Sequence, residues 1–570
     1  MDFASLVVIL EHRAATQGDE RALVFLTDRG AEESVLTFRQ LHDAANAVAK
    51  RLAAVAKPGE RALLVFPPGL EFVVAFFGCL IARVIAVPMM VPRRQSARDS
   101  SASIMANCKP GLLLTSRALA QRDDIAARFA DRPMQWLAVD LTPGAPGAIE
   151  LPRPQKDDIA FLQYTSGSTS DPKGVVVTHA MLLANMRMAR TYLGSGKHST
   201  CVNWVPHYHD MGLILAIIGS TYLGALCVLL SPSGFMQRPL TWLRAISDHR
   251  GEISASPNFS FDLCIARLRA EQMEGVDLSS WKITLSGAEP IRASTIETFI
   301  ETFQPYGFSP TSMNPGFGMA EATLIVSMSP VGAGHEKRTV SKAALQQHIV
   351  RDAVDGEDAQ VLVGCGYAMP DSRLAIVDPE TLKRLPSDAV GELWIQGPHV
   401  AQAYWENPEA SETTLHAHIA GDDGDWLRTG DLGFLDAKGQ LFVTGRIKDM
   451  IIIRGMNHYP QDIELTVQRA HPALRQNGGA VFSAADERGE EQLVVVQEVE
   501  RTARNRIDPQ EIAGIVREAV TEQHEVFARH IVLIRPNTLP KTTSGKVQRS
   551  LTRKLWLERK LDYLTVETAA

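Results

Sequence analysis

The sequence predicts an α/β protein with a large N-terminal domain of two α/β sheet layers and a small β-rich subdomain, followed by a smaller α+β C-terminal domain. Three observations predict this fold class. The chain has 570 residues, which is too long for a single hydrophobic core. Through its first half, apolar strands alternate with helical patterns, as in a mostly parallel sheet covered by helices. After about Ala375 the pattern changes to short strands separated by turns.

The strand–helix alternation begins at residues 36–57, where apolar residues recur at helical spacing. Thr37 is a suitable N-cap for this helix, and Pro58-Gly59 ends it. The next expected elements are a strand at 62–66, a helix at 71–81 and strands at 84–88, 201–205 and 283–287. Because consecutive strands are joined through helices, we expect a mainly parallel sheet.

The second half predicts two further units. Short strands at 374–378, 391–397 and 441–445 form the β-rich subdomain, which we place at about 375–446. A boundary follows near GRIKD (445–449). Beyond it we expect strands at 450–453, 480–484, 492–499 and 530–535, and helices opening near 460 and spanning 509–523. The predicted domains are therefore 1–446 and 447–570, the second being about 120 residues long, an ordinary domain size.

Composition excludes several functional classes. The net charge of −7 gives no basic surface for nucleic acid. The six cysteines contain no CxxC pair, which indicates reduced thiols and a cytoplasmic location. The N-terminus has a short apolar run without a basic leader, so we expect no signal peptide.

Residues 211–230 (MGLILAIIGSTYLGALCVLL) are uncharged and about long enough to span a bilayer. The alternative is a buried helix, a break near Gly224 and a buried strand at 225–230. Polar residues in the middle and the absence of basic flanks favour the buried elements. We therefore expect no membrane span.

The stretch YTSGSTSDPKGV (164–175) lies between apolar strands at 159–163 and 175–178, with a helix from Ala180. Its small hydroxyl residues, glycines and lysine can surround a phosphate with backbone N–H groups and a positive charge. The alternative is an exposed turn, because Ser, Gly, Asp and Pro are common turn residues. The stretch is not a GxxxxGK[ST] loop, which argues against a P-loop NTPase. The density of hydroxyl residues exceeds what a turn requires and favours phosphate binding.

Five other segments are suited to the same ligand: SGAEP (286–290), NPGFGMAE (314–321), WLRTGDLGF (426–434), GRIKD (445–449) and LPKTTSGKVQR (539–549). Each alone is weak. Together and in this order, from about Leu36 to Arg549, they resemble the adenylate-forming superfamily of acyl-CoA synthetases, luciferases and nonribosomal adenylation domains.

Further details resemble one branch, the fatty acyl-AMP ligases. WVPHYHDMGLI (204–214) and RGMNHYPQDIE (454–464) are similar to motifs of that branch, and an extra stretch at about 334–361 matches its insertion. The resemblance implies ATP-dependent activation of a fatty acid to acyl-adenylate with pyrophosphate release. The acyl group would then pass to the phosphopantetheine thiol of an acyl carrier protein, or of a carrier domain of a polyketide or nonribosomal synthase. It also implies that the insertion obstructs productive CoA transfer.

The resemblance implies roles for individual residues. Positions implied to hold ATP phosphates are Thr165, Ser166, Gly167, Ser168, Thr169 and Lys173. Thr165 and Glu321 would bind Mg²⁺. The remaining nucleotide-binding positions would be Gly287, Ala288, Glu289, Phe317, Gly318, Met319, Ala320, Asp431 and Arg446. Phe317 would stack on adenine, and Asp431 and Arg446 would take the ribose hydroxyls. His207, His209 and Asp210 would line or gate the acyl site. Lys448 would be the hinge of a mobile C-terminal domain, whose Lys546 would contact the reacting carboxylate and the α-phosphate.

This chemistry accounts for the residue types. A carboxylate that attacks the α-phosphorus brings two anions together, so the site must neutralise charge and align the reactants, and needs no protein nucleophile. Thr165, Lys173, Glu321 and Lys546 are thus the expected catalytic residues.

Several alternatives stay open. An acyl-CoA synthetase, a nonribosomal amino-acid adenylation domain and an inactive binding protein share the scaffold. His207 and His209 could be read as zinc ligands, although no third ligand is near in sequence. Met181–Met188 could line the acyl tunnel or belong to the core. Ala320 replaces a family threonine, and Arg83 replaces a common glycine for no reason evident in the sequence. In the insertion, Val340, Ala343, Leu345, Ile349 and Val350 have spacings that predict one packed helical face.

Overall fold

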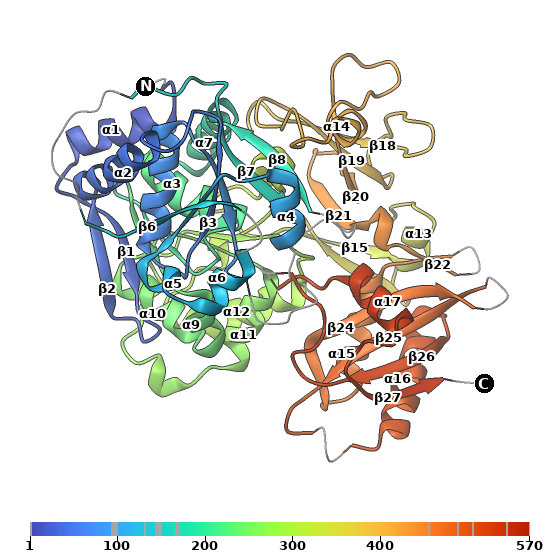
Figure 1. Ribbon diagram of the computed structural model, residues 1–570. Helices are drawn as coiled ribbons and strands as arrows, with labels where there is room; N and C mark the ends of the chain where they lie inside the picture. The colour runs from blue at the N-terminus through green and yellow to red at the C-terminus, as the bar shows by residue number, and fades with distance from the viewer. Residues whose placement is uncertain are drawn as a thin grey trace.

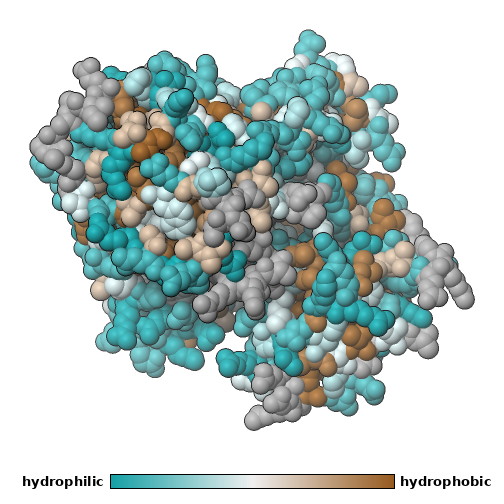
Figure 2. Space-filling model, in the orientation of Figure 1, coloured by the Kyte–Doolittle hydropathy of each residue, from teal (hydrophilic) through white to brown (hydrophobic). Residues whose placement is uncertain are grey.

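A computed structural model describes residues 3–92, 101–129, 133–142, 151–165, 172–453, 456–486, 490–503, 507–542 and 545–568. These residues form a large lobe, up to Arg446, and a C-terminal lobe that follows it (Figure 1). Hydrophilic residues cover most of the face in Figure 2, where the apolar patches are small and separate. In the described chain no helix is long and apolar enough to cross a membrane.

The large lobe contains two mostly parallel sheets. The first has the strand order β17-β14-β13-β12-β11-β9-β10-β1-β2, and only the pairs that involve β2, β14 and β17 are antiparallel. Its strands are β1 (Arg21–Leu26), β2 (Glu32–Thr37), β9 (Thr200–Asn203), β10 (Leu226–Leu229), β11 (Ile253–Ser256), β12 (Ile283–Ser286), β13 (Met313–Gly318), β14 (Ile325–Met328) and β17 (Tyr367–Ala368). The predicted α/β layers with a parallel sheet are confirmed.

The second sheet has the order β6-β5-β3-β4-β7-β8 and is parallel except for the β7–β8 hairpin. Its strands are β3 (Arg61–Val65), β4 (Ile85–Met89), β5 (Leu112–Ser116), β6 (Gln135–Val139), β7 (Ile159–Thr165) and β8 (Lys173–Thr178). Leu64 joins the large apolar cluster shared with the first sheet, whereas Leu63 and Val65 join a cluster on the opposite face. Both faces are buried, which explains why β3 has no polar alternation.

Helices cover these sheets. They are α1 (Leu6–Thr16), α2 (Phe38–Ala53), α3 (Leu70–Ala82), α4 (Ser101–Cys108), α5 (Arg117–Ala120), α6 (Asp123–Phe129), α7 (His179–Leu193), α8 (Gly219–Leu223), α9 (Pro232–Gln237), α10 (Leu240–Asp248), α11 (Asn258–Ala266) and α12 (Ala293–Phe303). The predicted cap of α2 is confirmed: Thr37 accepts from the Gln40 N–H, and the Gln40 side chain accepts from the Thr37 N–H. Met181 and Met188 are buried in the large apolar cluster, which favours their assignment to the core.

The structure explains why an arginine stands at position 83. Arg83 caps the end of α3 in the left-handed conformation (φ 56°), where glycine is usual. For a residue with a side chain this conformation costs about 1 kcal/mol. The guanidinium donates two hydrogen bonds of 3.0 Å to the carboxylate of Asp158, just before β7. A half-buried bidentate pair can offset that cost.

Residues 211–230 form buried elements of the core. A π-helix (Met211–Ile218) continues into α8, and Gly224 ends the run with a φ of 72° before β10. Met211 through Tyr222 are buried. The predicted helix, break and strand are confirmed.

The β-rich subdomain is an antiparallel sheet in the order β18-β19-β20-β21, with a short helix beside it. Its elements are β18 (Arg373–Val377), β19 (Gly391–Gln396), α14 (Pro408–Leu415), β20 (Leu427–Leu435) and β21 (Leu441–Arg446). It lies above the C-terminal lobe in Figure 1.

The insertion, residues 334–361, is folded but not as predicted. It forms strand β15 (Lys337–Ser341) and helix α13 (Lys342–Gln346), and it ends inside strand β16 (Ala359–Val363), which pairs antiparallel with β15. Val340, Leu345 and Val350 are buried against Phe434 and Phe442 of the subdomain, as expected of packed positions. Ala343 is exposed and Ile349 is 55% exposed, so the prediction of one packed helical face is wrong. The predicted positions fall in three successive segments, with Val340 in β15, Ala343 and Leu345 in α13, and Ile349 and Val350 after α13, so they do not share one helix.

The C-terminal lobe is an α+β unit with its own sheet, in the order β24-β25-β26-β27. Its elements are β22 (Ile451–Ile453), β23 (Met456–His458), α15 (Pro460–Ala470), β24 (Leu474–Ala485), β25 (Glu491–Val499), α16 (Pro509–His524), β26 (Ala528–Ile534), α17 (Arg549–Leu557) and β27 (Tyr563–Thr568). Two apolar clusters consist only of residues from 451 onward. The lobe therefore has cores separate from those of the large lobe.

Candidate active site

A cavity of about 2060 Å³ lies between the two lobes and collects the predicted residues. Among the described residues, those predicted to act there and found in its lining are Thr165, Lys173, His209, Asp210, Gly287, Ala288, Glu289, Phe317, Gly318, Met319, Ala320, Glu321, Asp431, Arg446, Lys448 and Lys546. They come from segments more than 380 positions apart in the chain (546 − 165 = 381). The fold thus brings together motifs that are individually weak.

The hydroxyl-rich stretch, residues 164–175, includes the end of strand β7 and the start of strand β8. Thr165 and Lys173 are cross-strand partners, so their side chains lie on the same face of the β7–β8 pair, and both residues line the cavity. Ser166, Gly167, Ser168 and Thr169 lie outside the described residues. The phosphate role of this stretch stays a prediction that rests on Thr165, Lys173 and the hairpin that carries them.

Glu321 is held by Tyr404, a residue that the sequence analysis did not identify. The Tyr404 hydroxyl donates to Glu321 Oε1 at 3.0 Å, and Lys173 Nζ lies 4.8 Å from the centre of the Tyr404 ring. The Ala401 N–H also donates to the Glu321 carbonyl. Tyr404 thus connects Lys173, the predicted phosphate ligand, to Glu321, the predicted Mg²⁺ ligand. Its position, 83 residues from Glu321, carries no local sequence signal.

The carboxylate of Glu321 is suited to a cation. Burial raises its pKa, and only the Tyr404 hydroxyl, a backbone N–H and the charge of Arg446 favour its ionised form. Thr165 and Glu321 both line the cavity, and their oxygen atoms are of the kind that a hard divalent ion such as Mg²⁺ prefers, so these two residues would hold the ion.

A narrow slot lies between the loop after β12 and strand β13. A Cβ on Gly287 would come within 2.9 Å of the Gly316 carbonyl oxygen, and one on Gly318 within 2.1 Å of the Leu324 oxygen. Ala288 is in the left-handed conformation, with φ 66°. Phe317 is half-buried in the cavity wall. Glycine is needed where these backbones pack so closely, and Gly287, Phe317 and Gly318 all line the cavity.

Asp431 and Arg446 face each other across β20 and β21. Arg446 Nε donates to Asp431 Oδ1 at 2.7 Å, and Asp431 is buried. A carboxylate fixed in this way presents its other oxygen as a hydrogen-bond acceptor, as a ribose diol requires.

Lys546 reaches the large lobe from the C-terminal lobe. Burial and the neighbouring Arg446 lower the pKa of its ammonium, while Asp210, Asp431 and Glu289 raise it. Lys546 therefore lies among the carboxylates of the cavity, and its contact with the two anionic reactants stays a prediction.

The three predicted gate residues have different surroundings. His207 is 5% exposed and packs its ring against Phe25 and Phe72, away from the cavity lining, so its position does not fit a gate. Its neighbour Tyr208, which the sequence analysis did not select, lines the cavity instead. A gate role for His207 is not carried forward.

His209 and Asp210 do line the cavity and form a pair at 2.7 Å. Asp210 also accepts from the Met211 N–H at 2.6 Å and so caps the π-helix. Burial acts to raise the pKa of Asp210, but His209, Lys546 and this N–H hold it below the usual value. Asp210 is thus an anion fixed opposite Lys546.

Lys448 is exposed within a single turn of 3₁₀ helix (Ile447–Asp449) that links the lobes. Its neighbour Asp449 accepts from Arg549 Nη1 at 2.9 Å, and Arg549 also binds both oxygens of Glu464 at 2.7 Å. The turn is thus attached to the C-terminal lobe, and its exposed lysine position is suited to a hinge.

The insertion contacts the C-terminal lobe directly. Gln360 Nε2 donates to Asp462 Oδ2 at 2.8 Å, and Asn457 Nδ2 donates to the Gln346 carbonyl at 2.8 Å. Lys342 Nζ donates to the carbonyl of Gln523. These contacts hold the lobe in the orientation that places Lys546 in the cavity.

Comparison with known proteins gives the same assignment as the geometry. Residues 10–405 match a family model described as AMP-binding enzyme, and residues 448–566 match one described as Disco-interacting protein 2-like, AMP domain. The chain is 41% identical, over 98% of its length and 96% of the relative's, to a medium-chain fatty-acid–[acyl-carrier-protein] ligase of Moorena producens.

Two solved structures are similar over nearly the whole chain. A fatty acyl-adenylate ligase of L. pneumophila, in complex with acyl adenylate and pyrophosphate, is 37% identical with a TM-score of 0.73, covering 99% of this chain and 98% of that one. A structure from studies of fatty acyl-adenylate ligases of E. coli and L. pneumophila is 31% identical with a TM-score of 0.88, covering 98% of both chains.

Proposed function

The chain belongs to the AMP-binding enzyme family and, within it, to the fatty acyl-AMP ligases, and on this basis we propose a function with two half-reactions. In the first, the carboxylate of a fatty acid attacks the α-phosphorus of ATP to give acyl-adenylate and pyrophosphate. In the second, the thiol of a holo acyl carrier protein, or of a carrier domain of a polyketide or nonribosomal synthase, takes the acyl group. The observation that carries the proposal is the meeting of Lys546 with Lys173, Glu321 and Asp431 in one cavity.

The residues have complementary tasks in the first half-reaction. The slot at Gly287 and Phe317 holds adenine, and Asp431 with Arg446 holds the ribose. Lys173 and Thr165, at the mouth of the loop, face the phosphates. Lys546 lies where the fatty-acid carboxylate and the α-phosphate meet, and its positive charge lowers the cost of bringing the two anions together.

The nucleotide would be bound with Mg²⁺, at Glu321 and Thr165. When bound, the ion neutralises charge on the phosphates. Tyr404 keeps the Glu321 carboxylate oriented through its 3.0 Å hydrogen bond. No protein group forms a bond to the acyl chain in this scheme.

In the second half-reaction the C-terminal lobe would turn about Lys448, because Lys546 lies in the cavity in the present orientation. The insertion resists this turn through Gln360, Lys342 and Gln346. We propose that this resistance disfavours free CoA, whereas a carrier protein gains enough contact area to accept the acyl group. The six cysteines are all buried and form no disulfide in the described structure, which is compatible with the predicted cytoplasmic location.

Product analysis tests the proposal. The purified protein is incubated with ATP, Mg²⁺ and fatty acids of graded length, and pyrophosphate release is measured for each acid. Acyl-AMP should accumulate in the presence of CoA, and addition of a holo carrier protein should consume it. Efficient synthesis of acyl-CoA by the unmodified protein would replace this function with that of an acyl-CoA synthetase.

A further inference from the structure

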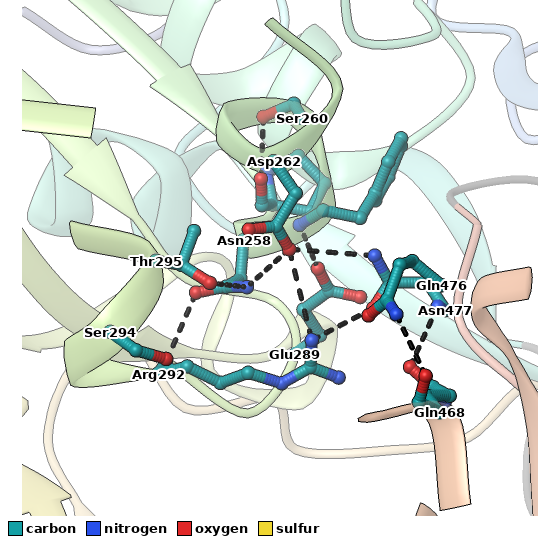
Figure 3. Close-up of polar contacts among 12 residues, drawn as sticks. Asn258, Ser260, Asp262, Glu289, Arg292, Ser294, Thr295, Gln468, Gln476 and Asn477 are labelled. Atoms are coloured by element: carbon teal, nitrogen blue, oxygen red, sulfur yellow. Dashed lines mark hydrogen bonds and ion pairs between the residues drawn. The ribbon is translucent and has the colours of Figure 1, made fainter. Parts of the chain in front are cut away.

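A polar cluster joins the two lobes beside the cavity, and Asn477 is at its centre (Figure 3). Asn477 Oδ1 accepts from Arg292 Nη1 at 2.9 Å, and its Nδ2 donates to Asp262 Oδ2 at 3.4 Å. Arg292 and Asp262 belong to the large lobe, whereas Asn477 lies in β24 of the C-terminal lobe. One amide side chain therefore uses both of its ends to bind the other lobe.

The backbone at Asn477 is arranged to present this side chain. The β24–β25 pairing skips from Leu474 to Gly479, which marks an irregularity in the strand. Within it Asn477 has a φ of 54°, a left-handed conformation that asparagine tolerates better than most residues. The Asn477 N–H donates to Gln468 Oε1 at 2.8 Å. The irregularity is thus fixed from within the C-terminal lobe, and its side chain points to the large lobe (Figure 3).

The cluster is continuous with the nucleotide slot. Arg292 follows the SGAEP loop directly, and its N–H donates to Asn258 Oδ1 at 3.0 Å. In the same loop Glu289 Oε1 accepts from the Phe259 N–H at 2.6 Å. The loop that forms the adenine slot and the docking site of Asn477 are therefore both hydrogen-bonded to the N-terminus of helix α11.

Asn477 also binds the segment that carries Lys546. Its carbonyl accepts from Lys541 Nζ at 2.6 Å, and Lys541 pairs with Val547 at the base of the turn that contains Lys546. At the tip of this turn, a Cβ on Gly545 would come within 2.8 Å of the Phe259 ring. The turn thus touches the large lobe at Phe259, and its base is tied to the residue that docks on Arg292 and Asp262.

We propose that Asn477 is a positioning residue for Lys546: it docks the C-terminal lobe on Arg292 and Asp262 and fixes the base of the lysine turn in that docked state. In this assignment Asn477 acts through Lys546 and not on the substrate. It acts only in the orientation that forms acyl-adenylate, because a turn of the lobe about Lys448 would separate Asn477 from the large lobe. This inference rests on the proposed function and assigns Asn477 to the first half-reaction alone.

The test separates the two half-reactions. Asn477→Gly removes the amide and keeps the left-handed backbone without strain. Asp262→Asn keeps the shape of the Asp262 side chain and removes its negative charge. It is the second variant, for the case in which Asn477→Gly does not fold. Gln476→Ala is the matched control, because the Gln476 side chain bonds to Gln468 within the C-terminal lobe.

For Asn477→Gly we expect kcat for acyl-AMP formation to fall about tenfold, the scale of one to two hydrogen bonds. KM for ATP should change less than about twofold, and transfer from supplied acyl-AMP to a holo carrier protein should be unimpaired. Asp262→Asn should show the same pattern more weakly, and Gln476→Ala should match the unmodified protein.

Three outcomes overturn the inference. Normal acyl-AMP formation in both Asn477→Gly and Asp262→Asn would show that docking does not need the cluster. Equal loss in both half-reactions would show that Asn477 is merely structural. If the unmodified protein forms no acyl-AMP, the proposed function fails and the inference falls with it, so the two failures are distinguishable.

Discussion

The contacts of the insertion with the C-terminal lobe give the most quantitative prediction. In the double variant Gln360→Ala/Asn457→Ala, three hydrogen bonds are lost. These are Gln360 to Asp462 (2.8 Å), Asn457 to the Gln346 carbonyl (2.8 Å) and Asn457 to His348 (3.0 Å). Each hydrogen bond contributes about 1 kcal/mol net, so the docked orientation loses about 3 kcal/mol relative to any turned one.

That energy is enough to change the population of states. A stabilisation of about 2.7 kcal/mol keeps a two-state equilibrium near 99:1, and each 1.4 kcal/mol is a factor of ten. A loss of about 3 kcal/mol would bring docked and turned orientations close to balance. If the turned orientation admits CoA, acyl-CoA formation should rise by one to two orders of magnitude.

The assay is chromatography of the products formed from ATP, fatty acid and CoA. The matched control is Gln347→Ala, an exposed position of the same insertion that should leave the product ratio unchanged. Thermal unfolding of each variant verifies that the fold is intact. If the double variant forms acyl-AMP normally but no additional acyl-CoA, the insertion does not restrain the lobe through these bonds, and the reasoning is refuted.

Four further predictions concern single residues. Lys546→Ala should lower acyl-AMP formation by at least about 100-fold with ATP affinity little changed, the scale of one oriented electrostatic contact; near-normal adenylation would contradict the assigned role. Glu321→Gln should weaken the Mg²⁺ dependence of turnover, because the amide lacks the charge a hard cation prefers; an unaltered metal titration would place the ligand elsewhere. Tyr404→Phe keeps the ring beside Lys173 but removes the hydrogen bond to Glu321, so the Mg²⁺ concentration for half-maximal rate should rise several-fold, about the effect of one hydrogen bond. Asp462→Asn should flatten the pH dependence of the melting temperature. Burial raises the pKa of Asp462 to about 7, so its stabilising contribution is complete below about pH 4 and is lost as pH rises through 7. If the melting temperature of the variant depends on pH as it does in the unmodified protein, Asp462 is not the cause of that dependence.

Local patterns predicted much of the fold. The predicted strands that the structure contains in the two large sheets are β3, β4, β7, β8, β9, β10 and β12. These strands, the cap at Thr37 and the buried run at 211–230 depend on apolar periodicity and turn residues, which act over a few neighbours. The insertion shows the limit of this reasoning. Its predicted apolar positions lie in β15, in α13 and in the segment after α13, and local spacing does not distinguish such a succession of short elements from one continuous helix.

The site was predicted where a motif is contiguous and missed where a contact is long-range. Lys546 and Asp431 stand in motifs that resemble a known family, and the structure places both in one cavity. Tyr404 and Asn477 act through partners 83 and 185 positions away, so no window of sequence reveals them. His207 was selected by its motif, but its ring completes an aromatic cluster with Phe25 and Phe72. Only tertiary packing separates it from His209.

The polar character of the contacts between the lobes has a thermodynamic consequence. Arg292 with Asn477, Arg469 with Ser294 and Gln360 with Asp462 are hydrogen-bonded pairs, and each lobe keeps its own apolar cores. The heat capacity of a protein changes mainly with the apolar surface that water gains or loses. Turning the C-terminal lobe would separate Tyr459 from the apolar cluster that it shares with Phe434 and Phe442, but it would leave the cores within each lobe buried. Its equilibrium should therefore have a smaller heat-capacity change than unfolding. The balance between the two orientations should therefore depend only gently on temperature, while the unfolding of either lobe retains the strong curvature of an apolar core.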